Sequence, residues 1–81
     1  MLSVTKESIL KPEAVIQRAI KFFGPNGVGL EVKEQDNCNA YFEGGGGSVR
    51  VTAATTAKGS KVDIETREWE SQTKDFLFTI K

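Results

Sequence analysis

Four consecutive glycines, residues 44–47, are the feature that most constrains how this chain of 81 residues can fold. Glycine reaches positive φ freely, lets another backbone or an aromatic ring approach closely, and weakens any regular element that contains it. A plain hairpin needs one or two glycines. The run therefore predicts a loop, a bulged bend in a sheet, or a place where a bulky neighbour lies against bare backbone.

The segments on either side of the glycines alternate apolar and polar residues, as strands with one buried face do. Segments 38–43 and 49–54 flank the run, and two more of this kind are predicted at 28–33 and 62–67. A weaker alternation begins at Leu2 and extends to Ser8. Short polar turns join the four consecutive strands, which favours an antiparallel meander.

Two segments have helical periodicity. The first begins at Pro12, where the missing N–H of proline costs nothing, and its apolar stripe runs to Phe23 before a glycine and a second proline end it. The second, 68–81, is ambiguous because the apolar residues near its end also alternate as in a strand. We predict a helix there, since a strand of that length is unusual. This choice leaves Phe78 off the apolar stripe.

These elements predict one domain over residues 1–81, of the α+β class, with the order β-α-β-β-β-β-α. In this arrangement the two helices cover the apolar face of an antiparallel sheet, and the other face is polar and mixed in charge. A chain of this length buries only about 60–65% of the surface that its unfolded state exposes, so there is room for one modest core.

The side-chain inventory excludes several functions. Lysine plus arginine and aspartate plus glutamate number 11 each, with no basic cluster, so we expect no nucleic-acid partner. The absence of histidine excludes Ser-His-Asp and Cys-His catalysis and the usual zinc sites, and we expect no cofactor. The apolar runs are too short to span a bilayer and no signal core follows the N-terminus, so we expect no membrane contact and a cytoplasmic location.

Several residues invite a functional interpretation that their context weakens. The glycines at 24–29 superficially suggest a phosphate loop, but this segment ends a helix and begins a strand. Glu43, Asp63 and Glu65 suggest a carboxylate pair for proton transfer, but alternation places them on the polar face beside Arg50 and Lys61, where cross-strand charge pairs are the ordinary outcome. We expect Cys38 to be a small buried residue on the apolar face. Tyr41 falls on the polar face, where it is either a lone exposed aromatic or an anchor for a partner.

The order of elements resembles a minimal TATA-binding-protein-like fold and a shortened form of the helix-grip architecture of the START and polyketide-cyclase superfamily. The resemblance is carried by Val-Thr at 4–5, Lys-Pro-Glu-Ala-Val at 11–15, Gly-Ser-Lys-Val at 59–62 and the terminal segment 69–80. It implies a C-terminal helix that closes over a curved antiparallel sheet. Full-length members of that superfamily are considerably longer, so we carry over no catalytic residue.

We therefore expect a small, non-enzymatic binding or interaction module. In one version a narrow cleft between the C-terminal helix and the curved sheet holds a small apolar ligand, with the glycines at its mouth and the indole of Trp69 covering them. The residues predicted to line this cleft are Phe22, Phe23, Phe42, Gly45, Gly46, Val51, Trp69 and Phe76. The alternative is a structural homodimer or assembly protein that uses a sheet edge or the Tyr41 face.

Overall fold

A computed structural model describes residues 2–25 and 27–80. Its elements are β1 (Leu2–Ser8), α1 (Pro12–Phe23), β2 (Glu31–Gln35), β3 (Asn39–Gly44), β4 (Gly47–Thr56), β5 (Gly59–Arg67) and α2 (Glu70–Thr79). The strands form one antiparallel sheet in the order β1-β5-β4-β3-β2. The predicted α+β class and element order are confirmed.

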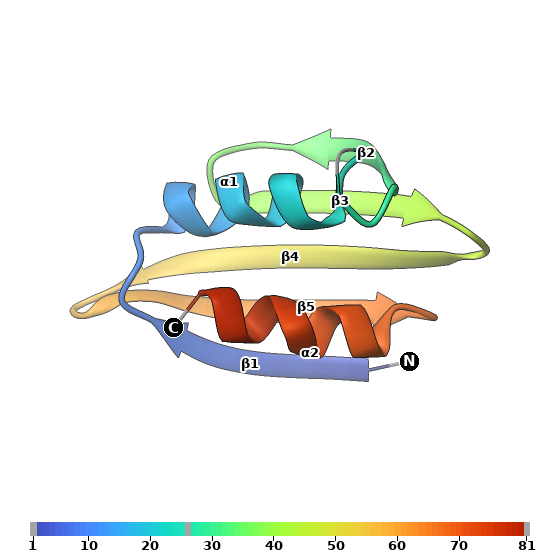
Figure 1. The fold of residues 1–81 in the computed structure, drawn as a ribbon. Coiled ribbons are helices and arrows are strands. Elements are labelled where there is room, and N and C mark those ends of the chain that lie inside the picture. The colour runs from blue at the N-terminus through green and yellow to red at the C-terminus, as the bar shows by residue number, and fades with distance from the viewer. Residues whose placement is uncertain (1, 26, 81) are drawn as a thin grey trace.

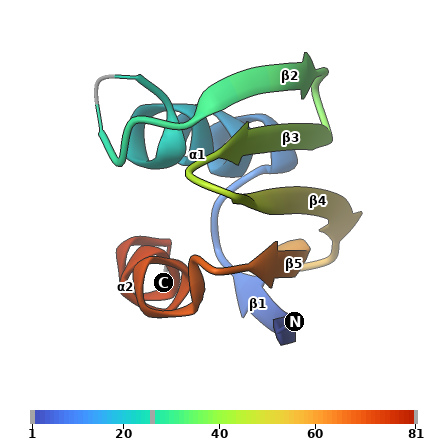
Figure 2. The same cartoon turned by 90° about the vertical axis from the view of Figure 1, so that its right-hand side faces the viewer.

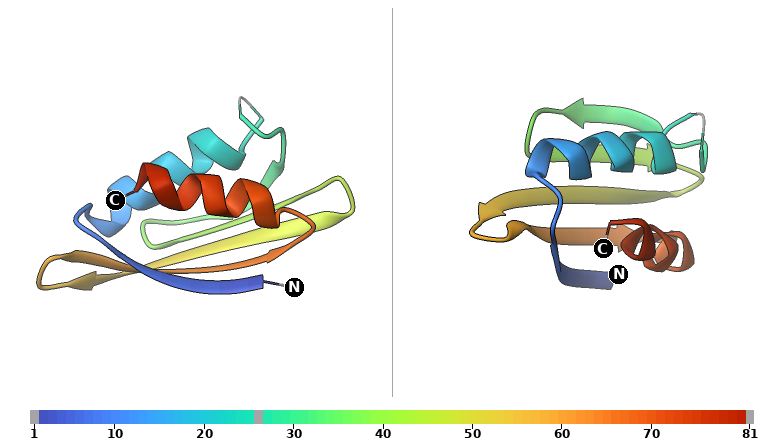
Figure 3. Two further views of the ribbon diagram at one scale, coloured as in Figure 1. Left: turned by 60° about the horizontal axis from the view of Figure 1, so that its bottom comes forward. Right: turned by 60° about the vertical axis from the view of Figure 1, so that its left-hand side comes forward.

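Both helices lie on the same side of the sheet, α1 towards β3 and β4 and α2 over β5 (Figure 1). A view turned by 90° shows the helices in one layer and the strands in another, and two further views show the helices side by side (Figures 2 and 3). No described segment covers the opposite side of the sheet. We call that side the open face; its outward side chains include Ser3, Thr5, Glu34, Asn39, Tyr41, Ser48, Arg50, Thr52, Asp63, Glu65 and Arg67.

Strict alternation along the strands builds the core. In β5, residues 60, 62, 64 and 66 are buried against the helices, while 61, 63, 65 and 67 are exposed. The core is completed by the apolar stripe of α1 and by one side of α2, and its largest fully buried side chains are Phe23, Phe42 and Phe76. Three buried phenylalanines therefore occupy the centre of the space between the two layers.

The C-terminus of α1 explains why one strand starts later than predicted. The N–H groups of Val28 and Leu30 donate to the carbonyl oxygens of Phe22 and Phe23, at 2.8 and 2.9 Å. These donors satisfy carbonyls that a helix end leaves without partners, so they are not available to a sheet. The first half of the strand predicted at 28–33 is therefore wrong, and β2 begins at Glu31.

The prediction for Cys38 was also wrong, because a turn extends further than its composition indicated. The backbone N–H of Cys38 donates to a carboxylate oxygen of Asp36 at 2.9 Å, as in an Asx turn. Cys38 therefore lies in the turn, although its carbonyl oxygen still accepts from the N–H of Ala53 in β4 at 2.8 Å. Its side chain is exposed, and β3 starts at Asn39. Ala40 and Phe42 then face the core as predicted.

The ambiguous C-terminal segment is a helix. Thr73, Phe76 and Ile80 are buried on its inner stripe, and Phe78 lies off that stripe with 68% of its surface exposed. The last turn of α2 contains no basic residue, although cations stabilise helix C-termini. Other elements supply the donors: Lys6 Nζ to the carbonyl of Leu77 at 2.9 Å, Arg18 to that of Thr79 at 3.2 Å, and the hydroxyl of Ser8 to that of Ile80.

Candidate functional site

Four of the residues predicted to line a cleft form a packed aromatic cluster. The ring of Phe23 lies 5.1 Å from that of Phe22, 5.2 Å from Phe76 and 5.6 Å from Phe42, measured between ring centroids. The rings of Phe22 and Phe76 are 5.6 Å apart. These separations fall within the range of favourable aromatic pairs. The structure therefore brings these residues together between the helices and the sheet.

The cluster fills the space in which the cleft was predicted. Phe23, Phe42, Val51 and Phe76 have no exposed surface, and Phe22 is half-buried. A ligand reaches the four fully buried side chains only if α2 moves away from the sheet. The set is thus a core in this conformation, and its role in binding a ligand stays a prediction.

The glycine run forms the hairpin between β3 and β4. Gly45 and Gly46 have φ values of 58° and 81°, and Gly44 pairs with Gly47 across the turn. Positive φ at both central residues is the conformation that matches the twist of a two-residue hairpin. Two of the four glycines are therefore needed for the turn itself, and the other two stand at the ends of the paired strands.

Trp69, directly before α2, lies against this hairpin. Its indole Nε1 donates to the carbonyl oxygen of Gly44 at 3.1 Å. A Cβ atom at Gly45 would lie 2.8 Å from Cζ2 of the same ring, and one at Gly47 would lie 3.0 Å from Nε1. The predicted contact between Trp69 and the glycines is confirmed: the bare backbone is the surface on which the indole rests.

Replacing Gly45 by alanine is expected to shift the indole N–H signal of Trp69 in a proton–nitrogen NMR spectrum, because the new methyl group displaces the ring. Gly46→Ala is the matched control, since it also places alanine at positive φ but a Cβ there meets no atom within 4 Å. Its indole signal should stay in place. Equal shifts in both variants would contradict the proposed packing.

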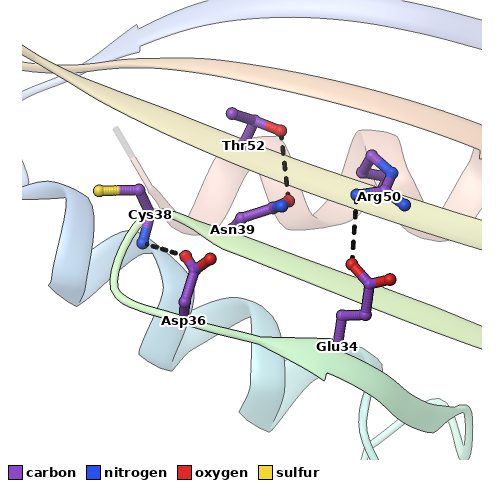
Figure 4. Close-up of polar contacts among 6 residues, drawn as sticks. All are labelled: Glu34, Asp36, Cys38, Asn39, Arg50 and Thr52. Atoms are coloured by element: carbon purple, nitrogen blue, oxygen red, sulfur yellow. Dashed lines mark hydrogen bonds and ion pairs between the residues drawn. The ribbon is translucent and has the colours of Figure 1, made fainter.

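A row of polar side chains crosses the open face from one edge of the sheet to the other. The pairing places Glu34, Tyr41, Arg50, Glu65 and Ser3 next to one another on successive strands, and we call them the central row. The guanidinium of Arg50 lies 4.6 Å from the centroid of the Tyr41 ring. Its Nη1 is 3.7 Å from a carboxylate oxygen of Glu34 (Figure 4). Arg50 is thus held between an aromatic ring and an anion.

A bulge in β2 sets the composition of this row. Val32 pairs with Phe42, and the next pair joins Glu34, not Lys33, to Tyr41. Without the extra residue, Lys33 would stand opposite Tyr41 and place a second cation near Arg50, whereas like charges side by side are unfavourable. The sequence predicted Tyr41 and Arg50 on the polar face but carried no signal for the bulge, so Glu34 was missed.

A second row, one step along the strands, is also joined by hydrogen bonds. The hydroxyl of Thr52 donates to the side-chain oxygen of Asn39 at 3.4 Å (Figure 4), and that of Thr5 donates to Asp63 at 2.6 Å. A shallow hollow of about 290 Å³ includes part of the central row; it is lined by Tyr41, Ser48, Arg50, Glu65, Thr66 and Arg67. The open face therefore presents side chains that are already oriented.

Thr73 is a buried polar group with an unsatisfied hydroxyl. The residue lies on the inner side of α2 with no exposed surface, and its Oγ1 has no hydrogen-bond partner. Leaving such a group unpaired in a core typically costs about 1–3 kcal/mol. This hydroxyl is the one uncompensated polar side-chain atom that the described part of the chain buries.

Thr73→Val is therefore expected to raise the free energy of unfolding by about 1 kcal/mol, because valine keeps the shape and removes the unsatisfied hydroxyl. Urea denaturation followed by far-UV circular dichroism measures the change. Thr55→Val, at an exposed position of β4, serves as the control and should change stability by less than about 0.5 kcal/mol. A loss of stability in Thr73→Val would show that the hydroxyl has a partner in solution.

These features define a two-layer α+β domain with a closed aromatic core and an uncovered, preorganised polar sheet face. Within residues 2–25 and 27–80, no group of three or more histidine, cysteine, aspartate or glutamate side chains is placed to hold a metal ion. Neither helix among those residues has the length and apolar character needed to cross a membrane. No known protein family, curated protein or solved structure matches the chain.

Proposed function

We propose that this chain is a small, non-enzymatic protein-interaction module whose contact surface is the open face. The observation that carries the proposal is the central row, in which Tyr41 stacks on Arg50 and Arg50 pairs with Glu34 on a side of the sheet that no described segment covers. Tyrosine and arginine are among the residues that contribute most to the affinity of protein interfaces.

Preorganisation supports this surface over the buried cluster. Ordering a long side chain on binding costs about 0.5–1.5 kcal/mol, and Arg50 is already held by two neighbours. The charges on the face alternate in sign, which suits a partner with complementary charges and opposes a nucleic acid, whose backbone needs clustered cations. In contrast, Phe23, Phe42 and Phe76 of the aromatic cluster have no exposed surface.

Arg50→Ala and Tyr41→Ala should each weaken binding of the physiological partner at least about tenfold, as expected for residues at the centre of an interface. Lys58→Ala is the matched control, because it removes a cation from an exposed position in the turn between β4 and β5. The measurement is quantitative capture of the partner by each immobilised variant. Capture that falls equally in the Lys58→Ala protein, or in none of the variants, would refute the open face as the contact surface.

A second copy of the chain is the competing partner for this surface, which would make the protein a structural homodimer. Sedimentation velocity over a concentration series separates the two possibilities. A dimer that Arg50→Ala dissociates would identify the partner as the chain itself. A monomer at all concentrations would leave the heterologous partner.

A small apolar ligand is the second candidate, and the unsatisfied hydroxyl of Thr73 favours it. A ligand that separates α2 from the sheet would meet the aromatic cluster and could offer its polar end to Thr73. Titration of fatty acids and aromatic compounds, followed by the fluorescence of Trp69, the single tryptophan, tests this candidate. A flat response across both groups would count against it.

We also propose a cytoplasmic location and a helix-grip or TATA-binding-protein-like arrangement for this module. Cys38, the single cysteine, is exposed and free, and a free exposed thiol suits a reducing compartment such as the cytoplasm. The position of α2 against the antiparallel sheet supports a helix-grip or TATA-binding-protein-like arrangement. The proposed module acts without a cofactor and without binding a membrane or a nucleic acid.

A further inference from the structure

A shallow, open groove lies on the helix layer, on the opposite side of the molecule from the open face (Figure 2). Its lining residues are Arg18, Lys21 and Phe22 from α1 and Thr79 from α2. The ring of Phe22 is half-buried, and its inner side packs on Phe23 and Phe76. The groove therefore has an aromatic wall that the core holds rigidly in place.

The polar part of this groove carries one sign of charge. Its lining includes two cations and no carboxylate. Arg18 uses one guanidinium nitrogen to donate to the carbonyl oxygen of Thr79, which positions the group while leaving its other N–H groups available. Within residues 2–25 and 27–80, Lys21 makes no ion pair. The open face differs, because Glu34 and Glu65 lie beside Arg50 there.

We propose that this groove binds an acidic, apolar peptide segment of a partner protein, with an apolar side chain against Phe22 and flanking carboxylates on Arg18 and Lys21. The groove is shallow and open to solvent, so it offers a contact surface for one or two side chains and does not enclose a drug-sized ligand. This site goes beyond the proposed function, since it lies on the other layer and does not depend on the central row.

The surroundings of the groove favour a peptide over a membrane surface. Binding in a bilayer interface requires a helix with a continuous apolar face turned to the lipid. The exposed sides of the two helices instead carry Glu13, Gln17 and Asp75, and Phe78 is the one large apolar side chain that protrudes from α2. The apolar contact is therefore confined to the groove.

The probe for this proposal is a capped synthetic peptide in which glutamates flank a leucine, titrated into the full chain and followed by proton–nitrogen NMR. Saturable shifts are expected at the backbone amides of Arg18, Lys21, Phe22 and Thr79. Lys21→Gln should weaken binding about threefold and Lys21→Glu about tenfold, because an exposed charge pair is first lost and then reversed. Lys74→Gln removes an exposed cation of α2 that does not line the groove and should leave the affinity unchanged.

Three results would overturn the proposal. The first is equal binding of a peptide with glutamines in place of the glutamates. The second is a loss of affinity in Lys74→Gln as large as in Lys21→Gln, which would indicate a general effect of charge. The third is the absence of saturable shifts with the glutamate peptide, whether or not the chain binds anionic phospholipid vesicles. Because Tyr41→Ala should leave peptide binding unchanged, failure here is distinguishable from failure of the open-face proposal.

Discussion

Replacing Phe23 by alanine is expected to lower the free energy of unfolding by about 3–5 kcal/mol. The side chain has no exposed surface, and its ring contacts the rings of Phe22, Phe42 and Phe76. A domain of this length has a total stability of about 4–12 kcal/mol, so the variant should be close to its unfolding midpoint in water or past it. Urea denaturation monitored by circular dichroism measures the loss.

Phe23→Leu is the graded control, because it keeps most of the apolar volume and should cost about 1–2 kcal/mol. Phe22→Ala provides a second comparison: this ring belongs to the same cluster but is half-buried, and its loss should cost less than that of Phe23. Equal losses for Phe22→Ala and Phe23→Ala would contradict the view that Phe23 is the centre of the cluster.

The second large effect is expected at the hairpin, where Gly47→Ala should destabilise the fold by about 3 kcal/mol. A Cβ atom at Gly47 would overlap the carbonyl oxygen of Arg67 and lie 2.7 Å from Cβ of Glu68. Part of this obstacle is backbone of the neighbouring strand, so β4 and β5 must separate to relieve it. Thermal unfolding and the indole N–H signal of Trp69 should both change.

Gly46→Ala separates this overlap from the effect of backbone conformation. Gly46 has a φ of 81°, and no atom lies within 4 Å of the position that a Cβ atom would take there. Its replacement therefore costs only the strain of alanine at positive φ, about 1–2 kcal/mol. If Gly47→Ala were no more destabilising than Gly46→Ala, steric overlap at the β4–β5 pair would not be the reason for a glycine at position 47.

Local signals in the sequence predicted most of the fold. The spacing of apolar residues and the proline near its start predicted α1 with the bounds that the structure shows, Pro12–Phe23. The helical stripe likewise predicted the inner side of α2 and left Phe78 off that side, where the structure shows it to be exposed. Both helices were predicted correctly for the same reason. Each buries a single face against the sheet, so the spacing of its apolar residues matches the spacing of its buried residues.

The errors arose where backbone hydrogen bonds overrode side-chain pattern. Val28 and Leu30 alternate with polar residues as in a strand, yet their N–H groups cap α1. Cys38 continues the alternation of β3, yet the side chain of Asp36 keeps its N–H in a turn. In both cases the pattern of apolar residues correctly predicted which neighbouring side chains are buried. It contained no information on the hydrogen-bond acceptors of the backbone N–H groups.

The sequence predicted which residues come together in the aromatic cluster, but not whether they leave a cleft or pack into a closed core. Apolar patterning placed Phe23, Phe42 and Phe76 on facing surfaces, but whether rings leave a gap or fill it depends on packing between elements far apart in the chain. The central row was even harder to predict from the sequence. The alternation of apolar and polar residues predicted that Tyr41 and Arg50 lie on the polar face. Glu34 joins them only because of a bulge in β2, and no residue type in the sequence indicated that bulge.

The placement of β1 at the edge beside β5 has a consequence for synthesis on the ribosome. Leu2 pairs with Thr66 and Ser8 with Ser60, and the hydroxyl of Ser8 also reaches Ile80, 72 positions away. At about 5–20 residues added per second, β1 waits roughly 3–12 s after its own synthesis before β5 has been made. β1 therefore precedes every other described element in the chain but is among the last to acquire its strand partner, and during that interval its backbone groups are open to pairing elsewhere.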